Sequence, residues 1–429
     1  MSLTLSNTHS ALLLESNVRT YCREFPAVFT TAQESTIVDD SGQRYLDFFS
    51  GAGALNYGHN NRRMKRALLD YIEQDGISHS LDFATEAKER FLERLRSVIL
   101  EPRGMDYRVQ FTGPTGADAV EAALKLARKV TGRLTVAHFV NSYHGMTLGA
   151  LAVTSNESKR SAASVPLQYA MSLPFDGDLG AGADSLAEFE FLLRNESSGR
   201  EIPAAVIVET VQAEGGVRVA SDSWLRRLAY LAKRYEFLLI VDDIQVGCGR
   251  TGSFFSFESA GLMPDLICLS KSIGGYGLPM SIVLIKPELD IWNAGEHTGT
   301  FRGNNLAFVT AAEALGYWET PAFSQEIHAK AQLLRTLCEE ISAATDSRIE
   351  WRGRGLIQGL AFENGAIARR VSNLTFERGA IAETCGPNGE VLKLIPPLTI
   401  AEAELREGMA RIGGAIRAAG ADRVAGATK

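Results

Sequence analysis

The sequence lacks paired cysteines, long apolar runs and an excess of positive charge. Its five cysteines are scattered and none forms a Cys-x-x-Cys pair, which argues against a disulfide framework or a thiolate metal site. No apolar run approaches the roughly 20 residues that a membrane-spanning helix needs. The formal net charge of −7 provides no basic surface for nucleic acid or anionic lipid.

These absences favour a soluble protein of the reducing cytoplasm. The first residues have no basic segment ahead of their short apolar run, so they do not resemble a secretory signal. His59 and His79 have no partners at metal-ligand spacing, and no metal site is predicted. The 429 residues exceed the size at which a single core usually stops growing, so two domains are expected.

The middle of the chain alternates short apolar runs with helical patterns. Most of these runs are continuous, which is typical of strands buried on both faces. They span residues 135–140, 204–209, 236–243, 266–270 and 281–286. A helical pattern covers 222–235, with Asp222 as the expected N-cap. The alternation predicts an α/β fold with a mostly parallel sheet covered by helices.

The two ends of the chain have a different pattern. The letters DDSGQ at residues 39–43 separate two strand-like runs, as in a hairpin. Long helical segments begin near residue 312, followed by a strand-like run at 355–363 and a final helix. We predict that residues 1–55 and 312–429 form a smaller α+β domain beside a large domain of residues 56–311.

A glycine-punctuated turn, FTGPTGAD, begins at residue 111 and leads into a helical pattern. Gly113, Pro114 and Gly116 cannot lie together inside a helix or a central strand. Backbone N–H groups at the start of a helix have no partner in the helix, so this turn predicts an anion site. It is not a Walker A motif, because no Lys-Ser/Thr follows the second glycine at the required spacing.

Two further segments place ionisable side chains directly after apolar runs. Asp242 and Asp243 end one run, and Lys271 follows the next; ligands of α/β sheets gather at such strand ends. Structural alternatives stay open, since the aspartates could be capped or ion-paired and the lysine could extend to solvent. With the turn, however, they supply the amine, the carboxylate and the phosphate cradle that a carbonyl cofactor needs.

These motifs resemble those of the class III, fold type I pyridoxal-phosphate aminotransferases. The similar segments follow in the family's order across nearly the whole chain: SYHG (142–145), ETVQAEGG (209–216), DDIQVGCGRTGSFFSFE (242–258), SKSIGGYGLP (270–279), TGTFRGNN (298–305) and LIPPL (394–398). The resemblance implies a large domain around a seven-stranded sheet, a smaller α+β domain, pyridoxal 5'-phosphate, and amino acid and 2-oxo acid substrates.

Within this family the closest resemblance is to the diaminobutyrate-forming branch of ectoine biosynthesis. It lies in residues 19–29, 45–61, 111–133, 299–305 and 371–379. In the turn at residues 113–116, Gly-Pro-Thr-Gly replaces the Asn-Ser/Thr-Gly that is common in the wider family. The expected reaction is L-aspartate 4-semialdehyde plus L-glutamate to L-2,4-diaminobutyrate plus 2-oxoglutarate. An ornithine or 4-aminobutyrate aminotransferase, a decarboxylase or aminomutase of the same fold, and a nucleotide-binding regulatory protein remain alternatives. The pathway that uses the product also stays open.

The resemblance assigns roles in cofactor binding. Lys271 would bind the cofactor covalently and move the substrate proton, and Asp242 would keep the ring nitrogen protonated. Tyr143 would stack on the ring, although ordinary core packing is its alternative. Thr300 would reach the phosphate of the neighbouring subunit, which implies a homodimer or a dimer of dimers. The implied cofactor contacts are Thr115, Gly116, Ala117, Tyr143, Glu209, Asp242, Gln245, Lys271 and Thr300.

Three residues are expected to contact the substrate. Arg302 stands where the family often has glycine, and it could hold a carboxylate or be a solvated interface charge. Lys393 stands where ornithine-type relatives have arginine, and it cannot form the planar two-bond fork. Glu214 would neutralise a basic partner when the second substrate binds. His144 is interpreted as structural support for the Tyr143 ring.

Overall fold

The computed structural model describes residues 14–180, 182–344 and 349–426. The helices are α2 (Tyr21–Glu24), α3 (Ser50–Gly53), α4 (Arg62–Glu73), α5 (Glu86–Arg94), α6 (Gly116–Thr131), α7 (Leu148–Ala152), α8 (Glu157–Arg160), α9 (Ala187–Arg194), α10 (Asp222–Tyr235), α11 (Asn305–Leu315), α12 (Ala322–Ala344), α13 (Gly365–Glu377) and α14 (Glu402–Gly426). Short 3-10 or π turns are η1 (Leu95–Leu100), η2 (Glu101–Arg103), η3 (Ser161–Ala163), η4 (Glu258–Ala260), η5 (Lys271–Gly274), η6 (Pro287–Leu289) and η7 (Gly316–Trp318).

The strands form a seven-stranded sheet, two four-stranded sheets and one short ribbon. They are β1 (Phe29–Gln33), β2 (Thr36–Asp39), β3 (Arg44–Asp47), β4 (Arg108–Phe111), β5 (Val136–Phe139), β6 (Ala170–Leu173), β7 (Ala205–Val208), β8 (Val211–Gln212), β9 (Arg218–Val219), β10 (Leu238–Asp242), β11 (Leu266–Leu269), β12 (Ile282–Ile285), β13 (Glu350–Arg354), β14 (Ile357–Ala361), β15 (Ala380–Ile381), β16 (Glu383–Cys385) and β17 (Val391–Leu394).

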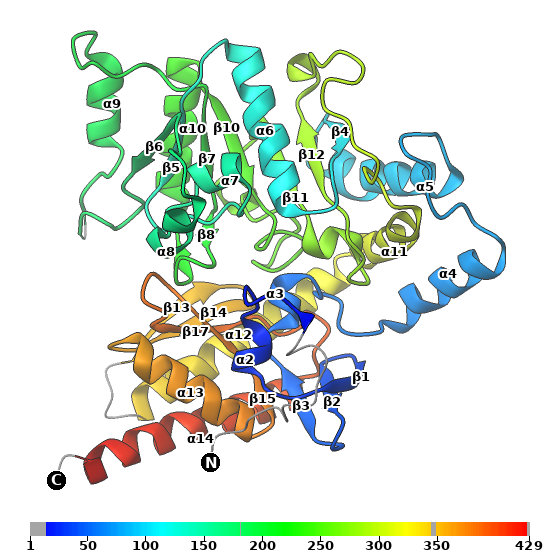
Figure 1. Ribbon diagram of the computed structural model, residues 1–429, viewed down its shortest axis with the longest axis vertical. Coiled ribbons are helices and arrows are strands. Elements are labelled where there is room, and N and C mark those ends of the chain that lie inside the picture. The colour runs from blue at the N-terminus through cyan, green and yellow to red at the C-terminus, as the bar shows by residue number, and fades with distance from the viewer. Residues whose placement is uncertain (1–13, 181, 345–348, 427–429) are drawn as a thin grey trace.

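The seven-stranded sheet has the order β4-β12-β11-β10-β7-β5-β6 and lies in the upper part of Figure 1. Its neighbours pair in parallel, except that β12 is antiparallel to both β11 and β4. The five runs predicted as strands are β5, β7, β10, β11 and β12. The predicted α/β fold with a mostly parallel sheet is therefore confirmed.

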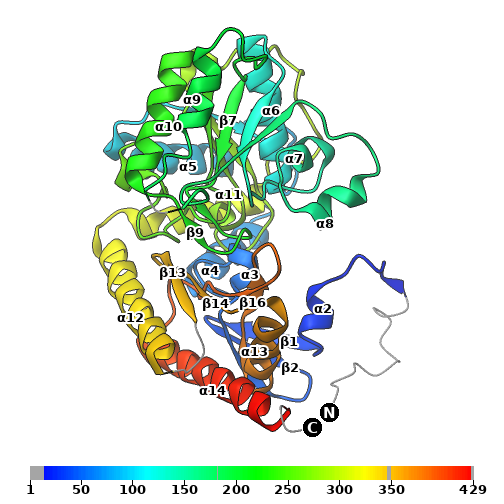
Figure 2. The ribbon, with the colours of Figure 1, turned by 90° about the vertical axis from the view of Figure 1, so that its left-hand side faces the viewer.

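Helices cover both faces of this sheet. Figure 2 shows α10 on one side of β7 and α6 and α7 on the other. Successive strand residues point to opposite faces: Val206 and Val208 join the cluster that contains Leu228 of α10, whereas Ala205 and Ile207 join the cluster of α6. Burial on both faces explains why the strands are continuously apolar rather than alternating.

The start of α10 corrects one local prediction. The helix begins at Asp222 as expected, but the N-cap is Ser221, whose hydroxyl accepts the Trp224 N–H at 3.3 Å. Asp222 is instead the first helical residue, where its negative charge suits the helix dipole. Serine and aspartate are equally good N-caps, so residue type alone could not separate these neighbours.

Residues from both ends of the chain share the sheet β1-β2-β3-β15. Strands β2 and β3 form the hairpin predicted around residues 39–43, and β15 adds to β3 in parallel with Ala380 opposite Leu46. The other four-stranded sheet, β13-β14-β17-β16, comes entirely from the C-terminal part and includes the predicted strand at 355–363. The domain boundaries at 55/56 and 311/312 remain our proposal.

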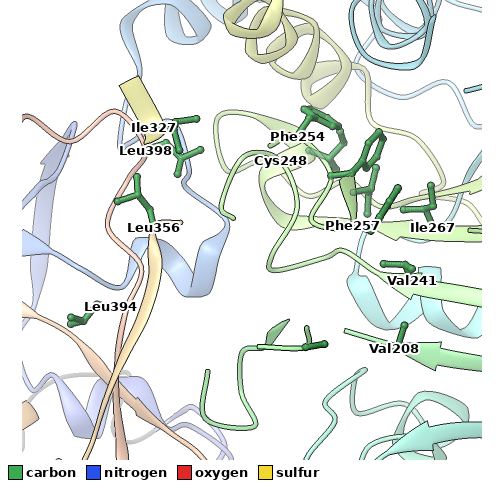
Figure 3. Close-up of a cluster of buried hydrophobic side chains, with 14 of the residues drawn as sticks. Val208, Val241, Cys248, Phe254, Phe257, Ile267, Ile327, Leu356, Leu394 and Leu398 are labelled. Atoms are coloured by element: carbon green, nitrogen blue, oxygen red, sulfur yellow. The ribbon is translucent and has the colours of Figure 1, made fainter. Parts of the chain in front are cut away.

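One apolar cluster continues from the large sheet into the C-terminal part (Figure 3). Val208, Val241 and Ile267 come from the sheet, and Leu356 and Leu394 belong to the same buried cluster. Continuous packing of this kind holds the two parts in one arrangement. A cavity lined by residues from both parts therefore has defined walls.

A buried arginine connects the same two parts through polar contacts. Arg250 is fully buried, and its guanidinium donates to the carbonyl of Leu356 at 3.0 Å, to the carbonyl of Pro396 and to the side-chain oxygen of Asn56. Burial lowers the pKa of Arg250 to about 9. One side chain thus ties together segments that lie nearly 200 positions apart in the chain.

None of the described helices has the length and apolar character that crossing a membrane would require. The described residues also contain no group of three or more His, Cys, Asp or Glu side chains placed to hold a metal ion. All five cysteines are described, and each is a free thiol.

Candidate active site

A cavity of about 280 Å³ opens where five strands of the large sheet end. Its walls come from the segments that follow β4, β5, β7, β10 and β11. These strands run in the same direction, so residues far apart in the sequence meet at one edge. The cavity brings together nine of the predicted site residues: Thr115, Gly116, Ala117, Tyr143, Glu209, Glu214, Asp242, Gln245 and Lys271.

The N-terminus of α6 forms one wall of this cavity. Gly116 and Ala117 are its first two residues, so their N–H groups have no acceptor within the helix. The Thr115 side chain caps the helix by accepting the Asp118 N–H at 3.3 Å. A Cβ on Gly116 would lie 3.1 Å from the Ile244 side chain, so glycine keeps this backbone accessible. The wall can therefore hold an anion such as a phosphate.

Asp242 lies at the end of β10 and is 4% exposed. Its Oδ1 accepts the Ile244 N–H at 3.1 Å, and its Oδ2 lies 2.7 Å from Nδ1 of His144. The sequence interpretation of His144 as support for the Tyr143 ring misses this contact, because 98 positions separate the two partners. A carboxylate held on both oxygens keeps one orientation, directed by the strand end toward the cavity.

Lys271 begins η5 directly after β11. Its φ of +52° places a non-glycine residue in the left-handed region, a strained conformation that is concentrated at functional sites. Burial lowers the pKa of its ammonium group from the ordinary value, although Glu214 acts in the opposite direction. Among the described residues, no ion pair or hydrogen bond holds its Nζ. Lys271 is therefore available as a nucleophile and base.

A buried carboxylate holds the backbone of Tyr143 in place. Its backbone N–H donates to Oε2 of Glu209 at 2.9 Å. Glu209 is 6% exposed, and burial raises the pKa of its carboxyl to about 7. The ammonium group of Lys159 lies over the Tyr143 ring in a cation–π contact, with Nζ 4.3 Å from the ring centroid.

Lys393 of β17 is the second lysine near the cavity, and it is fully enclosed. Its Nζ lies 2.5 Å from Oε1 of Glu214, 2.9 Å from Oε1 of Glu383 and 3.2 Å from Oε1 of Gln245. Burial alone would lower the pKa of Lys393, but the two carboxylates raise it well above its ordinary value. Lys393 is therefore a charged group whose partners are already in place.

Glu383 is a site residue that the sequence interpretation does not include. It lies on β16 directly opposite Lys393 of β17 in antiparallel register, and burial raises the pKa of its carboxyl to about 7. An acid within the apolar run of residues 380–385 is the available signal. Without the register, however, nothing in that run points to Lys393 as its partner.

Glu214 and Gln245 connect the two lysines. The Gln245 amide donates to Oε1 of Glu214 and to the carbonyl of Ala52, both at 3.1 Å. Burial acts to raise the pKa of Glu214, but Lys393 and Lys271 together lower it to about 2. Glu214 is thus a carboxylate that faces both cations.

Three predicted site residues do not line this cavity: Lys393, which contacts the lining residue Glu214, and Arg302 and Thr300. Arg302 lines a different one, where it donates to the His297 carbonyl at 2.6 Å and lies 3.5 Å from Asp82. The Thr300 carbonyl lies 3.0 Å from Nε2 of His79. Within one copy of the chain, therefore, neither Thr300 nor Arg302 is brought to Lys271.

Comparisons with known proteins agree with this arrangement. The class-III aminotransferase family profile matches residues 19–416. The chain is 56% identical to a diaminobutyrate–2-oxoglutarate transaminase of Nocardia farcinica over 94% of this chain and 92% of that protein. It is 53% identical to one of Halalkalibacterium halodurans, over 94% and 95%.

The structure is also similar to a solved enzyme. An ornithine aminotransferase from Toxoplasma gondii, whose structure reveals partial occupancy of pyridoxal phosphate (PLP) at the active site, superimposes with a TM-score of 0.83. The sequences are 27% identical, and the match covers 96% of this chain and 93% of that one.

Proposed function

Because the chain belongs to the class-III aminotransferase family, we propose that it transfers an amino group between L-glutamate and L-aspartate 4-semialdehyde with pyridoxal phosphate as cofactor. The products are 2-oxoglutarate and L-2,4-diaminobutyrate, and the reaction is reversible. The 56% identity to a diaminobutyrate–2-oxoglutarate transaminase, over nearly the full length of both chains, is the observation that carries this choice.

The residues around Lys271 fit this cofactor. Pyridoxal phosphate, when bound, supplies a carbonyl that takes up the amino group and a ring that withdraws electrons. The free N–H groups of Gly116 and Ala117 suit its phosphate. Asp242, fixed by His144, suits a protonated ring nitrogen. The amine of Lys271 lines the same cavity, where it can bind the carbonyl.

Lys271 also moves the substrate proton. Its lowered pKa leaves a larger neutral fraction of the amine near neutral pH than an exposed lysine has. The neutral amine would take a proton from the substrate carbon that carries nitrogen and deliver it to the bound cofactor within the same half-reaction. In the other half-reaction the same amine would carry a proton in the opposite direction, from the cofactor to the carbon of the second substrate. Asp242 is only 4% exposed, which strengthens its field on a partner held beside it.

A second copy of the chain would complete the site. Thr300 and Arg302 lie outside the Lys271 cavity, on either side of Phe301, which is 66% exposed. Arg302 contacts Asp82, and the next residue in the chain, Phe83, is also 66% exposed. Apolar side chains exposed in this way suit a subunit interface. We therefore propose a homodimer, or a dimer of dimers, in the cytoplasm, with Thr300 reaching the neighbouring phosphate. Light scattering of the pure protein measures the mass of the assembly and so distinguishes a monomer, a dimer and a dimer of dimers.

A panel of amino donors with 2-oxoglutarate, read as glutamate formed, tests the reaction. Diaminobutyrate is expected to have the highest kcat/KM among diaminobutyrate, ornithine and 4-aminobutyrate. If ornithine or 4-aminobutyrate exceeded it, the proposed substrate would be wrong while family membership would stand. Release of carbon dioxide from diaminobutyrate without a 2-oxo acid would instead identify a decarboxylase.

A further inference from the structure

A second cavity, of about 720 Å³, adjoins the cavity of Lys271. Its walls are residues 141–143, 155–161 except 160, 214–215 and 384–389. The two cavities share Tyr143 and Glu214. The larger space is therefore open to the far end of a substrate whose reacting nitrogen lies at Lys271.

Lys159 of α8 is the one lysine or arginine among the described residues that line this second cavity. Its Nζ lies 4.3 Å from the centroid of the Tyr143 ring, and no carboxylate of the described residues is ion-paired with it. Glu157 lies two positions earlier on the same short helix, and residues with that spacing do not face each other. Lys159 is thus a cation whose present partner is an aromatic ring.

Two other cations close to Lys159 and Glu214 are already engaged. Lys393 contacts the carboxylates of Glu214 and Glu383. Arg160, adjacent to Lys159, donates from Nη1 to the carbonyls of Leu151, Ala152 and Thr154 at 3.0, 2.9 and 2.7 Å. A negative ligand that enters the second cavity would have to break these contacts to reach either group. Lys159 has only a cation–π contact to give up, and such a contact is weaker than a buried ion pair.

We propose that Lys159 binds the substrate carboxylate that is remote from the reacting amino group. This inference rests on the proposed function, because diaminobutyrate reacts at its terminal nitrogen and carries a carboxylate at the opposite end. The ammonium moves from the Tyr143 ring to that carboxylate, forming a charge-assisted hydrogen bond at the junction of the two cavities. Lys159 thereby selects ω-amino acids over simple diamines.

Matched pairs of donors isolate this contact. 2,4-Diaminobutyrate and 1,3-diaminopropane differ only by the carboxylate, as do ornithine and 1,4-diaminobutane. Steady-state kinetics with 2-oxoglutarate would compare the wild type with Lys159→Ala, Lys159→Arg and the control Lys233→Ala, which changes an exposed lysine of α10. Thermal unfolding and the absorbance of bound cofactor would be recorded for each variant.

The expected result is a selective loss. Lys159→Ala lowers kcat/KM for the carboxylated donor roughly 10- to 100-fold, mainly through KM, because one charge-assisted hydrogen bond is lost. The loss on the matched diamine is at least about tenfold smaller. Lys159→Arg restores most of the preference, since the charge is kept, and Lys233→Ala behaves as the wild type.

Equal losses on both members of a pair would overturn the inference, because Lys159 would then act on Tyr143 or on the fold. An unchanged preference in Lys159→Ala, or a wild type that does not distinguish the members of a pair, would overturn it as well. The proposed function is read separately from the wild type. If the wild type preferred ornithine to diaminobutyrate, that proposal would fall, and the ornithine pair would still decide the role of Lys159.

Discussion

Lys271 and Lys393 both lie close to Glu214, yet their surroundings drive their pKa values in opposite directions. Lys271 has no ion pair or hydrogen bond among the described residues, and burial lowers its pKa. Lys393 is held between Glu214 and Glu383, and its pKa rises well above the ordinary value. Burial favours the neutral amine, whereas a carboxylate in contact favours the charged one.

The two lysines are therefore suited to different roles, Lys271 to proton transfer and Lys393 to stabilising the fold. The base of an amino-transfer reaction must exchange protons near neutral pH, which Lys271 is placed to do. A lysine between two acids stays charged and fixed, so it stabilises the junction of β16 and β17 with the cavity wall. Variants that remove one lysine at a time therefore affect different properties.

The largest expected effect is on the activity of Lys271→Ala. Removing the amine eliminates both covalent binding of the cofactor and proton transfer, so transamination should fall at least about 10⁴-fold. Borohydride reduction followed by mass spectrometry of the peptide containing residue 271 should detect cofactor in the wild type and in Lys233→Ala, but not in Lys271→Ala. A cofactor adduct on a different lysine would contradict the assignment.

Lys393→Met should mainly affect stability. It leaves the carboxylates of Glu214 and Glu383 buried without their cation, which costs about 3–5 kcal/mol in the free energy of unfolding. Urea denaturation followed by circular dichroism measures this loss. Adding Glu383→Gln to Lys393→Met should recover part of it, because one uncompensated charge is removed. A Lys393→Met variant with normal stability but no affinity for substrate would mean that Lys393 is a substrate ligand.

The smallest expected effect is a change in the pH dependence of stability in Glu383→Gln. Burial raises the folded-state pKa of Glu383 to about 7 from the ordinary 4.5. A raised pKa means that this group favours the folded state below about pH 4.5, and that this contribution is lost as the pH rises through about 7. In the wild type, the contribution of Glu383 to the free energy of unfolding should therefore decline over this window.

Glutamine does not titrate at residue 383. As the pH rises from 5 to 8, the free energy of unfolding of Glu383→Gln should therefore increase relative to that of the wild type by on the order of 1 kcal/mol. Unfolding free energies of both proteins at several pH values measure the difference. Parallel pH curves for the two proteins would show that Glu383 does not titrate in this range.

Much of the site could be predicted because its signals are local. Asp242 and Lys271 stand directly after continuous apolar runs, and parallel strands bring such positions to one edge. Gly116 begins a helix after a turn, and this pattern predicts an anion site without tertiary information. The contacts of His144 and Glu383 depend on partners on other segments, and for those the sequence offered only a residue type.

By itself, the sequence determined the central α/β architecture, the helix start that suits a phosphate, and the family, because hydrophobic periodicity and motif order are properties of short segments. Only the tertiary structure decided which groups meet. Strand register sets Glu383 opposite Lys393, the second cavity exposes Lys159 while Arg160 is engaged, and Arg302 lies away from Lys271. These outcomes depend on packing between distant segments, which no local pattern encodes.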